Sequence, residues 1–194
     1  MTIQTRRERE RAERERLIVT TARELAEAEG WDAVTTRRLA AEIEYSQPVL
    51  YSHFKGKGAI MAAVAEQGFA ELATTLRAAR TAKASAPAGL AAVASAYTDF
   101  AQQRPALYDA MFTHAVDLPF ATAEAPAPLR DAFGELVRAV APLTGGDDPT
   151  LLTETFWAAL HGLVTLTRSD RLPAAAHAER LSLLVARFTA APPA

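Results

Sequence analysis

The chain has 194 residues, of which 49% are apolar and 23% charged, which is the balance of a globular protein with one or two domains. It contains no cysteine, which excludes disulfides and thiolate metal sites, and no apolar run near the roughly 18 residues that a membrane helix needs. The net charge of −2 argues against a broadly basic coat for nucleic acid.

The first predicted helix covers about residues 6–29. Its apolar positions recur at steps of three and four from Leu17 onward, and Gly30 stands where a helix stop is expected. Before Leu17, arginine and glutamate alternate without the apolar core of a signal peptide, so we expect a cytoplasmic protein. The simpler interpretation of this charged stretch is a solvated helix end. The alternative is that some of its arginines touch a phosphate backbone.

Two short helices are predicted next. Thr35 is a suitable N-cap for the first of them, and the second follows a break at residues 43–46 and runs to about His53. Helices this short cannot bury their own apolar faces, so we expect these residues to pack against the flanking helices: Leu39, Ala40, Ile43, Leu50 and Phe54. One face of the second helix is then free to project, which suits the major groove of DNA. Its N-terminal amides and a capping Ser46 also suit a phosphate.

Helices continue to the end of the chain. A long one is predicted over residues 59–83, and a break in composition follows at residues 84–87. Beyond it, prolines mark helix starts, because their missing amide would be unpaired there anyway. The further predicted helices cover residues 105–114, 127–141, 149–168 and 173–188. Frequent alanine and leucine with short β-branched runs complete an all-α prediction.

Aromatic residues gather in the second half of the chain, and two interpretations stay open for them. A plain hydrophobic core is the commoner role for any one of them. Tyr, Trp and His, however, have polar tips that need partners, as in a mostly apolar cavity that orients a ligand. The candidate ligand pocket is formed by Tyr97, Phe100, Tyr108, Met111, Phe112, Phe133, Trp157 and His161.

The last two predicted helices carry apolar stripes that are wide for surface helices. Two such helices from each of two copies could form an isologous four-helix interface. The candidate interface residues are Leu152, Phe156, Leu160, Leu163, Leu181, Leu184, Val185 and Phe188.

Residues 50–57 read Leu-Tyr-Ser-His-Phe-Lys-Gly-Lys, and together with Thr35-Thr36-Arg37 and Gln47-Pro48 they resemble the tetracycline repressor (TetR) family. The resemblance implies a helix-turn-helix DNA-binding domain over about residues 12–72. It also implies an effector-binding and dimerisation domain over residues 85–188, where Trp157, His161 and Gly162 resemble the Trp-His-Gly type. This chain departs from the family pattern at Glu44, where the turn usually has glycine, at Gly58, where an acid is frequent, and at Pro48, where a small residue is commoner.

The resemblance also implies roles for single residues. Gln47 would read a purine edge, Arg37 would reach a guanine or a phosphate, and Pro48 and Val49 would touch thymine methyl groups. Other residues would hold the DNA backbone or add charge. The full implied contact set is Thr35, Thr36, Arg37, Ser46, Gln47, Pro48, Val49, Tyr51, Ser52, His53, Lys55 and Lys57.

The function implied is that of a homodimeric transcriptional regulator that represses from a palindromic operator in double-stranded DNA. A small, mostly apolar effector would release it, and no cofactor, metal or membrane is expected. Two other interpretations are an all-α enzyme or carrier that shares only the N-terminal pattern, and an architectural DNA binder without an effector. The sequence contains no Gly-x-Ser-x-Gly, Gly-x-Gly-x-x-Gly or phosphate-loop motif, and its four histidines lack metal-ligand spacing, so we expect no enzyme.

Overall fold

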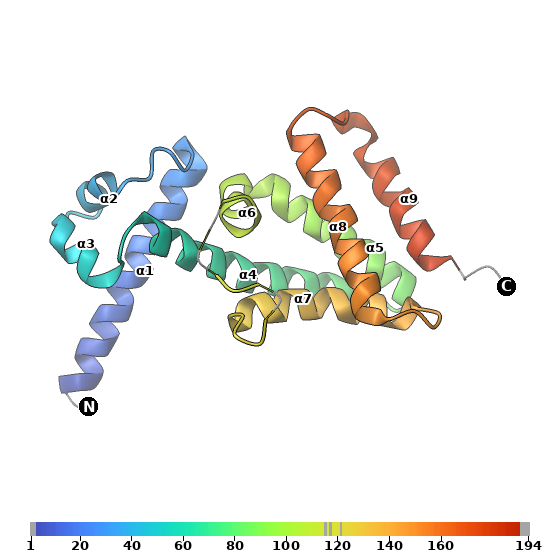
Figure 1. Ribbon diagram of the computed structural model, residues 1–194, viewed down its shortest axis with the longest axis horizontal. Coiled ribbons are helices and arrows are strands. Elements are labelled where there is room, and N and C mark those ends of the chain that lie inside the picture. Colours follow the sequence, from blue (N-terminus) through green and yellow to red (C-terminus); the bar gives the residue numbers. More distant parts are fainter. Residues whose placement is uncertain (1–2, 115, 117, 121, 191–194) are drawn as a thin grey trace. The chain divides into compact units, whose positions relative to one another are not determined.

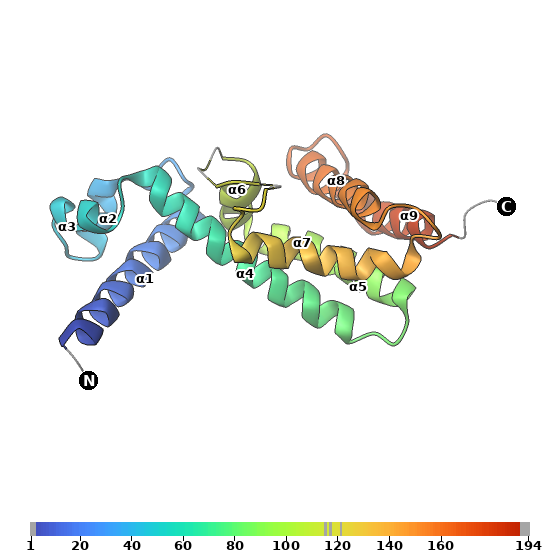
Figure 2. The ribbon, with the colours of Figure 1, turned by 60° about the horizontal axis from the view of Figure 1, so that its bottom comes forward.

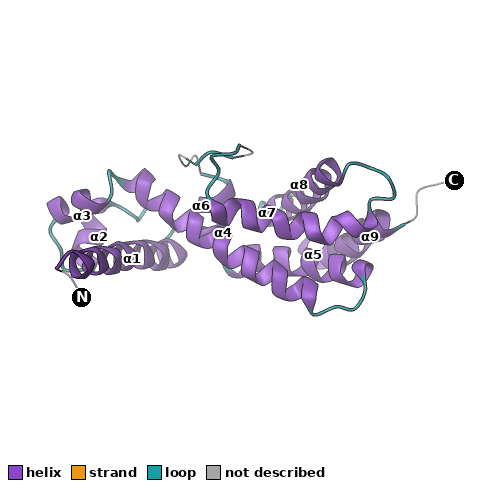
Figure 3. Ribbon diagram, turned by 90° about the horizontal axis from the view of Figure 1, so that it is seen from below, coloured by secondary structure: helices purple, strands orange, loops and turns teal. Residues whose placement is uncertain are grey.

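The computed structural model describes residues 3–114, 116, 118–120 and 122–190. In this part of the chain all regular structure is helical and no strand occurs (Figure 3), which confirms the all-α prediction. The α-helices are α1 (Ile3–Glu29), α2 (Thr36–Glu42), α3 (Gln47–His53), α4 (Lys57–Thr81), α5 (Ala86–Gln103), α6 (Pro105–Phe112), α7 (Ala127–Val140), α8 (Pro149–Arg168) and α9 (His177–Thr189). Two 3-10 turns, η1 (Ala141–Leu143) and η2 (Ala174–Ala176), precede α8 and α9. Among the described helices, none combines the length and apolar character needed to cross a bilayer.

The predicted helix starts at proline agree with the structure in two of three cases. Helices α6 and α8 begin at Pro105 and Pro149, as predicted, whereas Pro173 precedes the turn η2 and α9 begins only at His177. The sequence predicted no bounds for α5. Helix α1 begins at Ile3, and its arginine and glutamate residues form ion pairs four residues apart, such as Arg6 Nε to Glu10 Oε1 at 2.8 Å. Such pairs support a solvated helix.

The described chain divides into two compact units. The first contains the residues up to Gly68 together with residues 104–126. In this unit α1 packs against α2, α3 and α6 (Figure 1). Its core consists of apolar side chains that are at most 1% exposed: Ile18, Val34, Leu39, Leu50, Ile60, Val64 and Leu107. Helices α2 and α3 therefore pack against each other and against α1, as predicted for the first helix.

Within the first unit, side chains from α1 and the loop after it form hydrogen bonds with the backbone of α6. The indole Nε1 of Trp31 donates to the carbonyl of Ala106 at 2.7 Å. The carboxylate of Glu27 accepts from the amides of Ala106 and Leu107 at 3.1 and 3.0 Å, so it caps the start of α6. A Cβ atom at Gly68 would lie 2.5 Å from Sδ of Met111, so any larger residue there would force the Met111 side chain to move. The predicted domain bounds, 12–72 and 85–188, thus differ from the compact units at residues 104–126.

The second unit contains residues 69–103 and 127–194. Helix α5 packs against α7, α8 and α9, and α8 runs beside α9 (Figures 1 and 2). Tyr97, Phe100 and Phe156 are at most 2% exposed. The ring of Phe156 meets that of Phe188 edge-on at a centroid distance of 5.0 Å, which joins α8 to α9.

A buried carboxylate joins α7 to α4 within this unit. Glu135 is 1% exposed, and its oxygens accept from Arg77 Nε at 2.8 Å, Arg80 Nη2 at 2.8 Å and Arg138 Nη1 at 2.9 Å. Burial raises the pKa of Glu135, but the hydrogen bonds from Arg77 and Arg80 and the charges of Arg80 and Arg138 outweigh burial, so the pKa lies below its ordinary value. The carboxylate is therefore ionised and fully paired.

Candidate nucleic-acid interface

The turn between α2 and α3 is built without glycine. Thr35 is the N-cap of α2, as predicted, and its hydroxyl accepts from the amide of Arg38 at 3.1 Å. After α2, Glu44 adopts a φ of +56°, and the amide of Tyr45 donates back to the carbonyl of Ala40 at 2.9 Å. The left-handed conformation costs a residue with a side chain about 1 kcal/mol. Glu44 thus makes the same turn that glycine would make, with some strain.

Helix α3 has one buried and one exposed face. Leu50 is 1% exposed and fixes the helix on the core, whereas Tyr51 is 52% exposed. Of the twelve predicted contact residues, three are half-buried, namely Thr36, His53 and Lys57. The others are exposed: Thr35, Arg37, Ser46, Gln47, Pro48, Val49, Tyr51, Ser52 and Lys55. The sequence therefore identified a face that projects into solvent.

The start of α2 and the middle of α3 share this face. The hydroxyl of Thr36 lies 3.4 Å from the hydroxyl of Tyr51, within hydrogen-bond distance. Two hydroxyls side by side at the surface can donate to or accept from the same phosphate. This contact holds the two short helices as one surface.

The exposed face carries cations that no carboxylate neutralises. Among the residues that the structure describes, Arg37 and Lys55 form no ion pair. The neighbouring Arg38 is different, because its guanidinium pairs with Glu29 at 3.0 Å and with Glu42 at 2.7 Å. Arg37 and Lys55 are therefore the cations that remain available to a polyanion.

Two of the predicted contact residues point into the unit. The side chain of His53 is 6% exposed, and its Nδ1 lies 3.3 Å from Oε1 of Glu15 on α1. Lys57 Nζ donates to the carbonyl of Trp31. These side chains brace the end of α3 and the start of α4 against neighbouring segments. Glu15 occupies only Nδ1 of His53, so a phosphate contact would have to use the other ring nitrogen.

The prediction that the Ser46 side chain caps α3 is wrong. Ser46 occupies the N-cap position, but its hydroxyl makes no capping hydrogen bond. A capping side chain accepts from the amide two or three residues further on. Pro48 has no amide, and the amide of Val49 already donates to the carbonyl of Ser46 at 3.0 Å. The Ser46 hydroxyl is thus left exposed at the helix start.

The predicted ligand-pocket residues are divided between the two units. Tyr108, Met111 and Phe112 belong to the first unit, and the other five belong to the second: Tyr97, Phe100, Phe133, Trp157 and His161. In the second unit Trp157 Nε1 donates to the Tyr97 hydroxyl at 3.0 Å.

The same tryptophan is surrounded by two further rings. Its centroid lies 6.5 Å from that of Phe133 and 6.4 Å from that of His161. Burial lowers the pKa of His161, so its ring is neutral near pH 7. The Trp157–Tyr97 pair, a neutral imidazole and the apolar ring of Phe133 thus lie together in the second unit.

The predicted interface residues on α8 and α9 lie partly inside the chain. Phe156 and Leu160 are fully buried and Leu181 is 8% exposed, so they pack on their own chain. The remaining five are half-buried: Leu152, Leu163, Leu184, Val185 and Phe188. The leucines that face outward are others, which the sequence analysis missed: Leu151, Leu166 and Leu183, at 64%, 40% and 58% exposure. A wide apolar stripe includes leucines on two sides of the helix, and the periodicity of the sequence does not tell which side faces the core.

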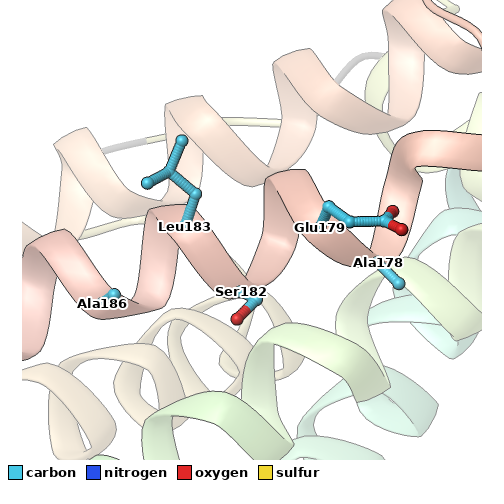
Figure 4. Close-up of a pocket in the computed structure, with 5 residues that line it drawn as sticks. All are labelled: Ala178, Glu179, Ser182, Leu183 and Ala186. Carbon is cyan, nitrogen blue, oxygen red and sulfur yellow. The ribbon is translucent and has the colours of Figure 1, made fainter.

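The outer face of α9 combines Leu183 with small side chains. Figure 4 shows Leu183 projecting from α9 near Ala186, whereas Ser182 and Ala178 point to other sides of the helix and Glu179 lies in the first turn. On α8, open space lies where a Cβ of Gly162 would be. Small residues allow another helix to approach closely.

Two family models match the sequence. Residues 18–64 match the model described as "Bacterial regulatory proteins, tetR family". Residues 90–188, about half of the chain, match the model described as "Tetracyclin repressor-like, C-terminal domain". The likeness to the Trp-His-Gly type of C-terminal domain stays a prediction.

Individual proteins resemble parts or all of the chain. An uncharacterized HTH-type transcriptional regulator, YobS of Bacillus subtilis (strain 168), is 33% identical over 50% of this chain and 50% of its own length. The tetracycline repressor protein class C of Escherichia coli is 47% identical over 25% of this chain and 22% of its own length. The matches thus span half or less of these relatives. A solved structure of a protein of unknown function from Rhodococcus sp. RHA1 is similar with a TM-score of 0.75 and 27% identity, covering 90% of this chain and 93% of that one.

Proposed function

Since this chain belongs to the tetR family of bacterial regulatory proteins, we propose that it is a repressor that binds a palindromic DNA operator as a homodimer and leaves it when a small effector binds. It acts by binding and not by catalysis, as a member of a regulatory family. The observation that carries the proposal is the exposed face of α3, fixed on the core by Leu50 and joined to α2 through Thr36 and Tyr51.

The residues of this face divide into those that read bases and those that hold the backbone. Gln47, with Pro48 and Val49, stands at the start of α3, the end that meets base edges when such a helix lies in the major groove. Arg37 is placed to reach either a guanine or a phosphate. The hydroxyls and Lys55 hold phosphates, which positions the protein without conferring sequence preference. Lys57 and His53 hold the end of α3 and the start of α4 in place through their contacts with neighbouring segments.

Replacing Gln47 by alanine is expected to relax the base preference at one position in each half-site. The loss of a bidentate base contact lowers discrimination by about 1–3 kcal/mol at that base pair. The operator is first selected from a random duplex library with the wild-type protein, and single-base variants are then measured by gel shift at fixed salt. The matched control is Lys55→Ala, which should weaken all duplexes alike and reduce the slope of log affinity against log salt by about two, one for each subunit of the dimer. If Gln47→Ala keeps the wild-type preference at every position, α3 does not read the operator.

Dimerisation explains how a seven-residue reading helix attains useful affinity. Two copies related by a twofold axis present two α3 helices to successive major grooves, provided that the operator is palindromic. We place the interface on the outer faces of α8 and α9, where exposed leucines alternate with small residues. The half-buried residues of the predicted set, such as Leu163 and Val185, would border this contact.

The effector is proposed to bind in the second unit, around Trp157, Tyr97 and His161. A neutral imidazole and one polar pair in apolar surroundings suit a mostly apolar molecule with few polar groups. Such a molecule shifts the equilibrium only if it binds the DNA-free state more tightly. Helix α4 supplies residues to both units and is the segment on which the change would act.

A panel of apolar compounds is expected to include at least one that displaces the labelled operator. Tyr97→Phe removes the hydroxyl that Trp157 holds, and it should change the concentration for half-release by about tenfold while leaving operator affinity without effector unchanged. The measurement is fluorescence anisotropy of the operator. If no compound in the panel displaces it, the chain is an architectural DNA binder and the effector proposal fails.

A further inference from the structure

A pocket of the second unit lies away from the Trp157 cluster. It has a volume of about 500 Å³ and is lined by the end of α5, the end of α8, the turn η2 and the start of α9. The lining residues are Gln102, Val164, Thr167, Arg168, Ala174, Ala175, His177 and Ala178. None of the residues of the predicted effector pocket is among them.

Three polar atoms at this pocket are buried without a partner. Within the described part of the chain, Thr167 Oγ1 and both ring nitrogens of His177, Nδ1 and Nε2, have no hydrogen bond. An unpaired buried polar group destabilises a fold, and native proteins rarely keep several in one place. Both residues line the same pocket, so a molecule bound there could pair with the Thr167 hydroxyl and with one ring nitrogen of His177. These unpaired atoms therefore indicate that the pocket is a ligand site.

The charge of the lining indicates the ligand class. Arg168 contributes a guanidinium, Gln102 an amide, and no carboxylate lies among the lining residues. The rest of the wall is apolar and consists of Val164 and three alanines. A ligand with an anionic group and an apolar chain would therefore complement both the polar and the apolar parts of the lining.

We propose that this pocket binds a small carboxylic acid with an apolar chain. Its carboxylate accepts from the Thr167 hydroxyl and from the His177 ring, beside Arg168, and its chain lies against Val164 and the alanines. The proposal does not depend on DNA binding or on the Trp157 site, because the binding can be measured without DNA.

Octanoate is the probe for the first test, with octanamide and acetate as controls. Isothermal titration of the full-length chain is expected to show one octanoate per chain, with octanamide weaker by about tenfold because it lacks the charge. Acetate should be weaker too, since it lacks the apolar chain. In an NMR titration, the ring nitrogens of His177 should shift on addition of octanoate, while those of His161 stay in place.

A variant pair separates a ligand site from a structural threonine. Thr167→Val removes an unpaired hydroxyl, so it should raise the melting temperature and weaken octanoate by about tenfold. Thr153→Val on the same helix is the matched control, because Thr153 is fully buried but its hydroxyl donates to the Pro149 carbonyl at 2.6 Å. That control should lower the melting temperature and leave octanoate binding unchanged.

Two results would overturn the proposal. One is that Thr167→Val lowers the melting temperature as Thr153→Val does, which would mean that the hydroxyl is already paired in solution. The other is that octanoate fails to bind the dimer, or binds only a monomeric variant, which would assign the pocket to contact with a second copy. Loss of octanoate binding with intact operator binding leaves the proposed DNA-binding function standing, so the two failures are distinguishable.

Discussion

Leu183→Asp is expected to produce monomers and to weaken operator binding by at least about 100-fold, because simultaneous engagement of two half-sites multiplies affinity by 10²–10⁴. Leu183 is 58% exposed and lies between Ser182 and Ala186 on the outer face of α9. A carboxylate there would have to be desolvated in a helix-to-helix contact between copies. Sedimentation velocity measures the association state, and anisotropy measures operator affinity.

The control is an equally polar substitution at an exposed aromatic residue outside α8 and α9. Phe120→Asp serves, since Phe120 is 42% exposed and belongs to the first unit. It should remain dimeric. Because Leu183 is exposed in the single chain, circular dichroism should show an unchanged helical fold in Leu183→Asp monomers. A Leu183→Asp protein that sediments as a dimer would remove α9 from the proposed interface.

Glu135→Gln is expected to destabilise the chain by about 3 kcal/mol, which is the low end for removing one partner of a buried ion pair. The three arginines would lose their carboxylate, but Arg77 and Arg138 are 58% and 55% exposed, so water compensates part of the loss. Urea unfolding monitored by circular dichroism measures the change. Glu154→Gln, an exposed residue on α8, is the matched control and should change the free energy of unfolding by less than about 0.5 kcal/mol.

The contribution of Glu135 should also depend on pH in a definite direction. Its pKa in the folded chain lies below its ordinary value of 4.5, so the unfolded chain takes up the proton first. The stability that the ionised carboxylate supplies is complete above pH 4.5 and is lost as pH falls through the lowered pKa. The difference in unfolding free energy between wild type and Glu135→Gln should therefore be constant at neutral pH and shrink in acid. A difference that grows on acidification would contradict the ionised, paired state.

The sequence predicted the N-terminal part of the fold and the face of α3 well. A motif with fixed spacing specifies which side of a short helix is buried, and Leu50 and Tyr51 lie on the predicted sides. The N-cap at Thr35 is equally local, because it depends on a hydroxyl and an amide three residues apart. At Glu44 the sequence showed only a departure from the family's glycine, and the structure shows that this residue adopts the positive φ itself.

Apart from the Ser46 cap, which is a local error, the parts that the sequence did not predict depend on contacts between segments far apart in the chain. The side-chain cap at Ser46 was predicted from residue type, but the missing amide of Pro48 removes one of its two donors. The burial of His53 depends on Glu15, 38 residues earlier. On α8 and α9 the stripe was recognised, yet which leucines face outward is decided by the packing of α5 against both helices. The cluster around Glu135 could not be anticipated, because neither Arg77 nor Arg80 is close to it in sequence.

The attachment of α6 to the N-terminal unit has a consequence for hybrid regulators. Glu27 and Trp31 bind main-chain atoms of Ala106 and Leu107, and main-chain atoms are offered by any helix that starts at the same place. A hybrid that joins the N-terminal helices of this chain to the C-terminal helices of another regulator therefore keeps these hydrogen bonds, even when the new helix in place of α6 differs in sequence. The identity of the residue at position 111 matters more, because the long, flexible side chain of Met111 fills the space beside Gly68. A graft with a β-branched residue there would leave a void beside Gly68, and the junction would loosen at that point first.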